Sequence, residues 1–210
     1  MNTKDNLMKH INTKEMVFQD MPKEENTNFI WGDFINEQVI DDLTHLVNEE
    51  PYYLFTQDGR SNRGVDKNIK DSTDTYLPLL LNHPAIQNYL TALQEVLEKY
   101  LDKFPWAGAY EGFKIKKEIN YQWYAPGGGF KVWHTERSGS SSEDQNRHLV
   151  YMTYLNDVPD GGTDWFHQSL YVPAQKGYTV IWPADWTHTH RGHVSETSEK
   201  AIVTGWYEFT

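Results

Sequence analysis

Two short segments of the chain carry side chains that could bind a metal ion. The segment "VWHTERSG" contains His134 and, two residues later, Glu136. The segment "WTHTHRGH", residues 186–193, contains three of the nine histidines of the chain. Imidazole nitrogens and carboxylate oxygens bind divalent ions such as Zn²⁺ and Fe²⁺. The two segments therefore predict a metal site whose members come from distant parts of the sequence.

The spacing of His134 and Glu136 suits one face of a strand. Alternate side chains of a strand point the same way, so both could face one ion if residues 130–136, "FKVWHTE", form a strand. A His-x-Glu pair also occurs by chance on exposed strands, where it binds nothing. The pair therefore predicts half of a metal site, and a further histidine has to complete it.

The further histidine should come from the second segment. His188 and His190 are two residues apart, so in a strand their side chains would point to the same face. His193 is an odd number of residues from both, has the opposite parity, and lies beyond Gly192. Parity thus removes one candidate and leaves His188 and His190 as alternatives. His190 lies ten residues before Lys200.

Composition restricts the classes of function. The chain has 210 residues, a formal net charge of -11 and no cysteine. Because acidic residues outnumber basic ones, we do not expect a basic surface that could bind a phosphate backbone. Nucleic acid is therefore not an expected partner. Without cysteine, any metal must bind to histidine and carboxylate side chains. No signal peptide or transmembrane segment is recognised, and we expect a cytoplasmic protein that does not contact a membrane.

Two helices are predicted in the first half of the chain. Residues 34–50 place apolar side chains at helical spacing, with Asn36 as a candidate N-cap and Pro51 beyond the end. Residues 82–104 show a second apolar stripe, and Pro84 suits the first turn of that helix. Each helix should bury one face against another layer of the protein.

The period changes to two near Phe113, which predicts short strands separated by turns. The predicted strand segments lie within residues 113–126, 130–136, 147–158, 169–174, 178–184 and 200–209. Helices followed by many short strands predict a mainly β protein of the α+β class, a double-stranded β-helix or jelly roll with both helices on the larger sheet. We expect a single domain over residues 1–210, with mostly helical support and a lid loop in 1–111 and the jelly-roll core in 112–210.

Two polar segments are candidate lids over a site. Residues 56–74 lack a period and contain Arg60 and Arg63, and this segment is predicted to be a loop. Arg137 and Arg147 bracket the loop "SGSSSED". Either loop could close over a substrate, although each arginine taken singly is better explained as a solvated charge.

Several ordered motifs resemble one family. The segments "YAPGGGFKVWHTE", "YLNDVPDGGTDWF", "VPAQKGYTVIWPA", "HRG" and "KAIVTGW" follow in the order found in the iron(II)- and 2-oxoglutarate-dependent dioxygenases of the prolyl 4-hydroxylase-like branch. The resemblance covers roughly residues 113–207. Glu136 departs from the commoner aspartate of the family, and "GGTDWF" permutes the usual Gly-Gly-Glu-Thr-x-Phe.

The resemblance implies roles for five residues. His134, Glu136 and His190 would bind the metal, because the ten-residue spacing to Lys200 matches the family for His190 rather than His188. Lys200 would bind the far carboxylate of 2-oxoglutarate, and Tyr124 resembles a tyrosine that hydrogen-bonds the same group. No catalytic residue beyond the metal ligands is implied.

The position of Lys200 has its own interpretation from the residues. Four side chains alternate along the last predicted strand and should share a face: Lys200, Ile202, Thr204 and Trp206. Lys200 could therefore reach into a cavity, where a buried ammonium needs an anion. We assign Trp133, Trp182 and Trp206 no role, because tryptophans are more often core residues than cofactor contacts.

The resemblance also implies the reaction. Fe(II), O₂ and 2-oxoglutarate, with ascorbate as an optional further cofactor, would hydroxylate an unactivated C–H group and release succinate and CO₂. The substrate could be a prolyl or other side chain of a peptide or protein, or a small molecule. The sequence does not separate these substrates or predict an oligomeric state.

Two alternatives do not involve an oxygenase. A jelly roll could be a metal-bearing binding protein without turnover. A set of His134, His188, His190 and His193 could instead form a zinc site for hydrolysis. A halogenase is disfavoured, because members of the family that halogenate lack the carboxylate ligand and Glu136 is present.

Overall fold

The computed structural model describes residues 28–49, 54–61, 64–139 and 141–210. The helices are α2 (Glu37–Glu49), α3 (Pro84–Lys103) and α4 (Ser142–Gln145), with 3-10 turns at Pro105–Gly108 and Trp186–His188. The strands are β1 (Trp31–Phe34), β2 (Phe55–Asp58), β3 (Lys70–Asp71), β4 (Thr73–Leu77), β5 (Phe113–Ile115), β6 (Ile119–Tyr124), β7 (Gly129–Phe130), β8 (Arg147–Tyr154), β9 (Val158–Trp165), β10 (Leu170–Ala174), β11 (Tyr178–Pro183), β12 (His190–Gly192) and β13 (Lys200–Phe209).

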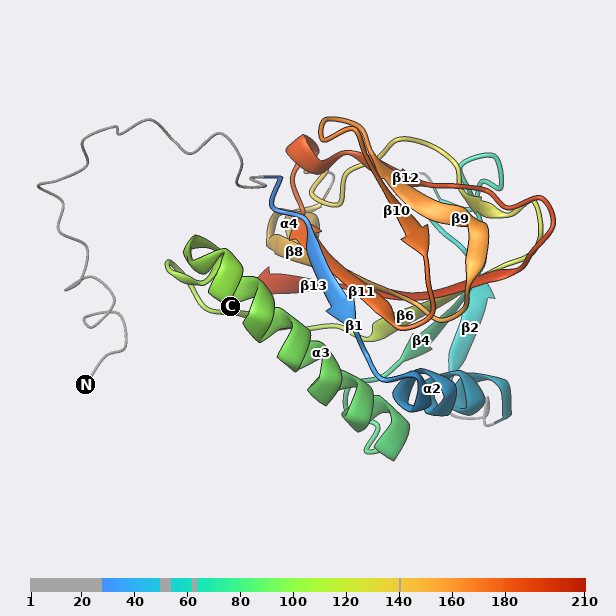
Figure 1. Ribbon diagram of the computed structural model, residues 1–210, viewed down its shortest axis with the longest axis horizontal. Coiled ribbons are helices and arrows are strands. Elements are labelled where there is room, and N and C mark those ends of the chain that lie inside the picture. Colours follow the sequence, from blue (N-terminus) through green and yellow to red (C-terminus); the bar gives the residue numbers. More distant parts are fainter. Residues whose placement is uncertain (1–27, 50–53, 62–63, 140) are drawn as a thin grey trace, which may run out of the picture.

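The strands form a large sheet and a small sheet that pack face to face. The large sheet has the order β1-β11-β8-β13-β6-β4-β2, with β5 also paired to β13. The small sheet has the order β10-β9-β12, and β3 pairs with β7. Trp165 of the small sheet packs with Val150 and Trp182 of the large one in one apolar cluster. This antiparallel arrangement is the predicted jelly roll (Figure 1).

The two long helices cover the outer face of the large sheet, as predicted (Figure 1). Leu43 of α2 and Leu93 of α3 are buried in a cluster that also contains Leu149 and Val203 of the sheet. Alternate residues of the same strands point the other way, because side chains of a strand alternate between faces. The large sheet therefore has one face under helices and one face toward the small sheet.

Both helices begin where the sequence indicates. Asn36 precedes α2, and its Oδ1 accepts a hydrogen bond from Gln38 N at 2.8 Å. Pro84 occupies the first turn of α3, after His83 as N-cap. Pro51 lies outside the described residues. No helix within the described ranges is long and apolar enough to cross a membrane.

The prediction that residues 56–74 form a loop is wrong. Strands β2, β3 and the start of β4 lie there, and β4 pairs with β6 in the large sheet. With β1, these strands make the first 111 residues less helical than expected. The segment lacks a hydrophobic period because β2 is largely exposed, while the buried positions Lys70, Ser72 and Asp74 are polar.

Candidate metal centre

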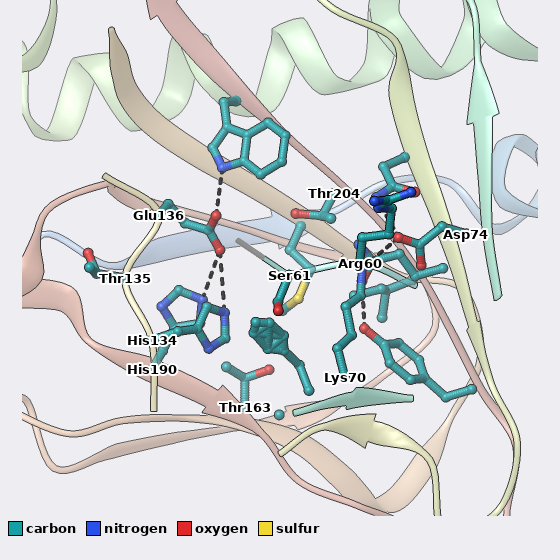
Figure 2. A pocket seen from close by; sticks show the side chains of 18 of the residues that line it. Arg60, Ser61, Lys70, Asp74, His134, Thr135, Glu136, Thr163, His190 and Thr204 are labelled. Carbon is teal, nitrogen blue, oxygen red and sulfur yellow. Dashed lines mark hydrogen bonds and ion pairs between the residues drawn. The ribbon is translucent and has the colours of Figure 1, made fainter. Parts of the chain in front are cut away.

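Three side chains converge between the two sheets. Glu136 Oε1 lies 3.5 Å from His134 Nε2 and 3.4 Å from His190 Nε2. The three ligand atoms lie within 4.8 Å of one another, and this is the one such cluster of histidine and acidic groups among the described residues. Figure 2 shows the carboxylate of Glu136 pointing toward both imidazoles. The geometry therefore offers one oxygen and two nitrogens to a single ion.

A pair of backbone hydrogen bonds holds the two histidines together. His134 N donates to His190 O at 3.0 Å, and His190 N donates to His134 O at 2.9 Å. This isolated antiparallel bridge is the only ladder contact of His134, so the prediction of a continuous strand over residues 130–136 is wrong. Only Gly129–Phe130 is strand, and the chain is irregular beyond it. The imidazoles of His134 and His190 are therefore brought together by backbone pairing with β12. The alternation of side chains along one strand does not explain their proximity.

Hydrogen bonds to the Nδ1 atoms orient both imidazoles. His134 Nδ1 lies 2.9 Å from Val132 O, and His190 Nδ1 lies 2.9 Å from His188 O. A carbonyl oxygen can only accept, so each Nδ1 carries a proton, and Nε2 is the ring nitrogen that is directed toward Glu136. Burial, with the neighbouring His190, lowers the pKa of His134 below its usual value. Neutral imidazoles with bare Nε2 atoms are the form that binds a metal ion.

The second oxygen of Glu136 is held from the other side. Trp206 Nε1 donates to Glu136 Oε2 at 3.0 Å, which leaves Oε1 facing the histidines. Burial by itself would raise the pKa of Glu136, but the hydrogen bonds and charges of His134 and His190 outweigh it and hold the pKa well below its usual value. Glu136 is therefore an ionised ligand with a fixed orientation.

Arg147 supports this arrangement and is not the solvated loop charge that we expected. Its guanidinium carbon lies 3.7 Å from the ring centroid of Trp206, and its Nη1 donates to Glu136 O at 2.7 Å. Its Nη2 also lies 3.2 Å from Asp144 Oδ1. Trp206 and Arg147 are thus the two residues that sequence reasoning missed. The shared parity of Trp206 and Lys200 was the available signal for the first. The second was noted only as an arginine that brackets the loop after Glu136, and nothing in the sequence indicated its contact with Glu136.

The other arginines lie in different settings. Arg60 lines the cavity beside the three converging side chains. Arg137 pairs with Asp185 instead and does not line that cavity. Arg63 lies outside the described residues.

His188 and His193 do not join the cluster. His188 Nε2 lies 2.8 Å from Asn28 O, so that nitrogen donates to a backbone carbonyl. His193 Nε2 is bound to the carboxylate of Asp164. Neither side chain is among the clustered ligands, which does not fit a zinc site made of four histidines. Of the two candidates left open by parity, the structure places His190 beside Glu136.

The three residues open into a cavity of about 670 Å³. Lys200, Ile202, Thr204 and Trp206 all line it, as the alternation along β13 predicts. Trp133 and Trp182 line it as well. A volume of this size suits small-molecule ligands, which in proteins occupy about 300–1,000 Å³.

Lys200 lies inside the cavity and is only 5% exposed. Its Nζ donates to Gly161 O at 2.9 Å and to His193 O at 2.7 Å. Burial lowers its pKa to about 8, with Asp160 acting in the opposite direction. The ammonium thus has two neutral acceptors, and one of its three protons remains for an anion.

Tyr124 is the cross-strand partner of Lys200, whose Nζ lies 5.3 Å from the centroid of the tyrosine ring. The hydroxyl of Tyr124 donates to Gln122 Oε1 at 2.5 Å. Burial and the nearby carboxylates of Asp74 and Glu136 raise the pKa of Tyr124 well above its usual value, so it stays protonated. To bind a ligand carboxylate through this proton, Tyr124 would have to release Gln122.

This set of donors fits a non-haem iron site. Two imidazole nitrogens and one carboxylate oxygen could occupy one face of an octahedral ion and leave three positions free. The Nδ1 contacts of the histidines and the indole contact of Glu136 are the supporting hydrogen bonds that such ligands need. The three residues can therefore hold Fe(II) together with a bidentate ligand and O₂.

Comparison with known proteins finds one matching sequence family and a set of solved structures with a similar fold. The sequence model of the 2OG-Fe(II) oxygenase superfamily matches residues 119–208. No curated protein sequence matches the chain.

Solved structures of several prolyl hydroxylases share the fold. A prolyl-4-hydroxylase of Pseudomonas putida matches with a TM-score of 0.64 at 15% identity, covering 88% of this chain and 94% of that one. A prolyl hydroxylase of Trichoplax adhaerens, in complex with a hypoxia inducible factor peptide fragment, matches with a TM-score of 0.68 at 12% identity, covering 88% and 85%. The viral collagen prolyl hydroxylase of Paramecium Bursaria Chlorella virus-1 matches with a TM-score of 0.60 at 15% identity, covering 88% and 98%. Identities this low establish the similarity of fold alone.

Proposed function

Since the chain is an Fe(II)- and 2-oxoglutarate-dependent oxygenase with the fold of the prolyl 4-hydroxylases, we propose that His134, Glu136 and His190 hold its iron. The convergence of Glu136 Oε1 on both Nε2 atoms, at 3.5 and 3.4 Å, is the observation that carries this assignment. Iron bound there, with 2-oxoglutarate and O₂, supplies the oxidant that hydroxylates an unactivated C–H group while succinate and CO₂ are released.

The protein side chains orient the reactants. The Nδ1 contacts to Val132 O and His188 O fix the planes of the two imidazoles, so that both Nε2 atoms and Glu136 Oε1 are directed to one position, where an ion would bind. Trp206 holds Oε2, so Oε1 is the carboxylate oxygen that would face an ion. Because these partners are already in place, binding the ion requires little reorganisation.

Lys200 and Tyr124 bind the distal carboxylate of 2-oxoglutarate. Lys200 is buried, keeps one proton free after its two carbonyl contacts, and lines the same cavity as the metal ligands. A buried ammonium without a counter-ion is costly, and a carboxylate ligand offsets that cost. Tyr124, beside it in the ladder, adds a hydroxyl donor once it leaves Gln122.

The residues 1–210 serve this site as one domain, in which the helices stabilise the outer face of the large sheet. The substrate is a peptide, a protein side chain or a small molecule. A peptide is compatible with the fold, because the Trichoplax adhaerens prolyl hydroxylase of the same fold was solved with a peptide fragment. We propose no nucleic-acid partner, because the chain has a formal net charge of -11.

An anaerobic titration tests the assignment. We expect the protein to bind one Fe(II), to bind 2-oxoglutarate only weakly without iron and tightly with it, and to form succinate when O₂ is admitted. His190→Ala should lose iron binding, whereas the matched control His188→Ala should keep it. A binding protein would take up the ligand without forming succinate, and a zinc hydrolase would ignore 2-oxoglutarate.

A further inference from the structure

The cavity extends past the residues assigned to iron and 2-oxoglutarate. Figure 2 shows the proposed metal ligands on one side of the cavity and Asp74 on the other, with Thr204 between them. Strand β6 contributes inward side chains at Asn120, Gln122 and Tyr124, all of which line the cavity. The part of the wall around Asn120 has no role in the proposed function so far.

Asn120 carries an unsatisfied acceptor in this wall. The residue is 7% exposed, and its Oδ1 has no hydrogen-bond partner among the described residues. Its Nδ2 donates to Asp74 Oδ2 at 3.4 Å. This contact fixes the orientation of the amide, because turning it over would place Oδ1 against a carboxylate. A buried acceptor without a donor destabilises a protein, so a ligand that supplies a donor gains by binding there.

A buried ion pair supports Asn120 from behind. Lys70 Nζ lies 2.6 Å from Asp74 Oδ2, and Ser72 Oγ donates to Asp74 Oδ1 at 2.7 Å. Lys70 and Asp74 are 5% and 1% exposed. Their charges cancel, so the pair holds the amide without requiring a charged ligand. The network makes Asn120 a preorganised acceptor rather than a mobile side chain.

The register of the large sheet separates Asn120 from the 2-oxoglutarate end. Tyr124 pairs with Lys200, whereas Asn120 pairs with Thr204, two residues before Trp206. Four residues along a strand correspond to about 13 Å. Asn120 therefore lies on the side of Trp206, the residue that binds Glu136, and away from the ammonium of Lys200.

We propose that Asn120 is a specificity-determining residue, whose Oδ1 accepts a hydrogen bond from an N–H group of an amino-acid-derived substrate. This inference rests on the proposed function, because it concerns the second organic ligand of the same cavity. Charges of both signs surround this part of the wall, with Arg60 and Lys117 facing the same cavity as Glu118 and Asp74. Such a surface suits a zwitterionic amino acid or a peptide better than a hydrocarbon.

The test uses pairs of probes that differ in the N–H group. Free L-amino acids are paired with their N-trimethyl forms, and capped dipeptides are paired with forms methylated at one amide nitrogen. Each probe is added to the iron-loaded protein with 2-oxoglutarate and O₂, and succinate and oxygenated product are measured. We expect the N–H member of at least one pair to have a kcat/KM about tenfold or more above its methylated partner, the effect of about one hydrogen bond to a buried acceptor. The free and capped arms distinguish an amino acid from a peptide.

Two asparagine variants decide whether Asn120 is responsible. Asn120→Leu removes the acceptor at similar volume and should reduce the preference for the N–H probe to about onefold. Asn156→Leu is the matched control, because both polar atoms of that amide are already bonded, to Glu199 O at 3.0 Å and Ala201 N at 2.8 Å, outside the cavity. It should lower the melting temperature and keep the preference.

The outcomes separate this inference from the proposed function. If the wild-type protein binds neither iron nor 2-oxoglutarate, the proposed function itself is wrong. If it converts 2-oxoglutarate but no N–H probe stimulates that conversion, or if Asn120→Leu retains the preference, the assignment of Asn120 is overturned and its acceptor serves a water molecule only. Loss of the preference in Asn120→Leu, with iron and 2-oxoglutarate still bound, supports the assignment.

Discussion

The two faces of the large sheet are made of alternate residues of the same strands, yet they have different chemistry. On β8, Leu149 and Tyr151 pack under the helices, while Val150 and Met152 face the small sheet. On β13, Val203 belongs to the helix-covered core, and Lys200 lies in the cavity. The outer face is an apolar core, whereas the inner face carries the cluster that we propose binds iron, together with buried charges.

This difference separates stability from function within one element. Apolar burial on the outer face stabilises the sheet without any specific geometry beyond good packing. The inner face keeps charged and unsatisfied groups, such as Lys200 and Asn120, that cost stability and become useful when a ligand is present. We therefore expect substitutions on the outer face to lower the stability of the fold and leave ligand binding unchanged. We expect substitutions on the inner face to weaken ligand binding while the protein stays folded.

The largest expected effect is on the inner face, at a metal ligand. His190→Ala should lower iron affinity by more than the roughly 10–100-fold typical of residues that only support a ligand. The folded state should survive, since the helix-covered core is untouched. Iron titration by calorimetry, with thermal unfolding of the same sample, measures both effects. Loss of iron binding in His188→Ala but not in His190→Ala would mean that the wrong histidine was assigned.

Lys200→Met should have the next largest effect. The carboxylate of 2-oxoglutarate would lose its charge partner in a buried site, which costs about 2–5 kcal/mol. The 2-oxoglutarate concentration needed for half-maximal succinate formation should therefore rise by roughly 30- to 4,000-fold, at about 1.4 kcal/mol per tenfold. Iron affinity should stay the same. An unchanged requirement for 2-oxoglutarate would remove Lys200 from the site.

Leu149→Ala probes the outer face of the same sheet. Leu149 is 1% exposed, and truncating a buried leucine costs about 2–5 kcal/mol through lost apolar contacts and the cavity left behind. Chemical denaturation should show this loss, while the folded fraction should bind iron and 2-oxoglutarate as the wild-type protein does. A variant of normal stability with weakened iron binding would contradict the separation of the two faces.

Trp206→Phe removes the indole N–H that Glu136 accepts but keeps a ring under Arg147. We expect iron affinity to fall by about 10–100-fold, the usual effect of losing a hydrogen bond to a metal ligand. Trp186→Phe is the control, because Trp186 is 66% exposed and lies outside the cavity. Equal iron affinities for the two variants would show that the indole contact has no positioning role.

The smallest expected effect is a pH dependence that comes from the protonation of Lys200. Burial lowers the pKa of Lys200 to about 8 from an ordinary value of 10.5. Below pH 8 the lysine is protonated in both the folded and the unfolded chain, and its burial then destabilises the fold. Between pH 8 and 10.5 only the unfolded chain keeps the proton, so this group makes stability rise with pH.

Binding of the carboxylate needs the protonated form of Lys200. The affinity for 2-oxoglutarate should therefore fall above pH 8 by up to about tenfold per pH unit. Titrations of the iron-loaded protein over this range measure the slope. Lys200→Met lacks the titrating group and should show no such slope, so a similar decline in both proteins would point to a different group.

The sequence predicted the layers of the fold and part of the site. The helical periods of residues 34–50 and 82–104 and the alternation after Phe113 correspond to α2, α3 and the jelly-roll strands. Alternation along residues 200–206 also placed Lys200 and Trp206 on the cavity side. Local period is readable from sequence because it reflects which face of an element is buried.

The prediction from sequence was wrong where the strands are either largely exposed or carry polar residues at their buried positions. Residues 56–74 contain β2, β3 and the start of β4, whose charged and hydroxyl side chains hid the strand period. Asp74 is buried only because Lys70 and Ser72 bind it. Such partners become visible only after the chain has folded, so local composition indicated a loop.

The sequence by itself determined which residue types could bind a metal and that Lys200 and Trp206 share one face of the last strand. Only the tertiary structure decided that His190 rather than His188 lies beside Glu136, because the choice depends on the backbone bridge between His134 and His190. It also decided that Trp206 and Arg147 support the carboxylate and that Asn120 keeps an unpaired acceptor. Those roles arise from contacts between segments distant in sequence. The spacing of residues along β13 indicates that Trp206 faces the cavity, but it does not indicate which group the indole contacts.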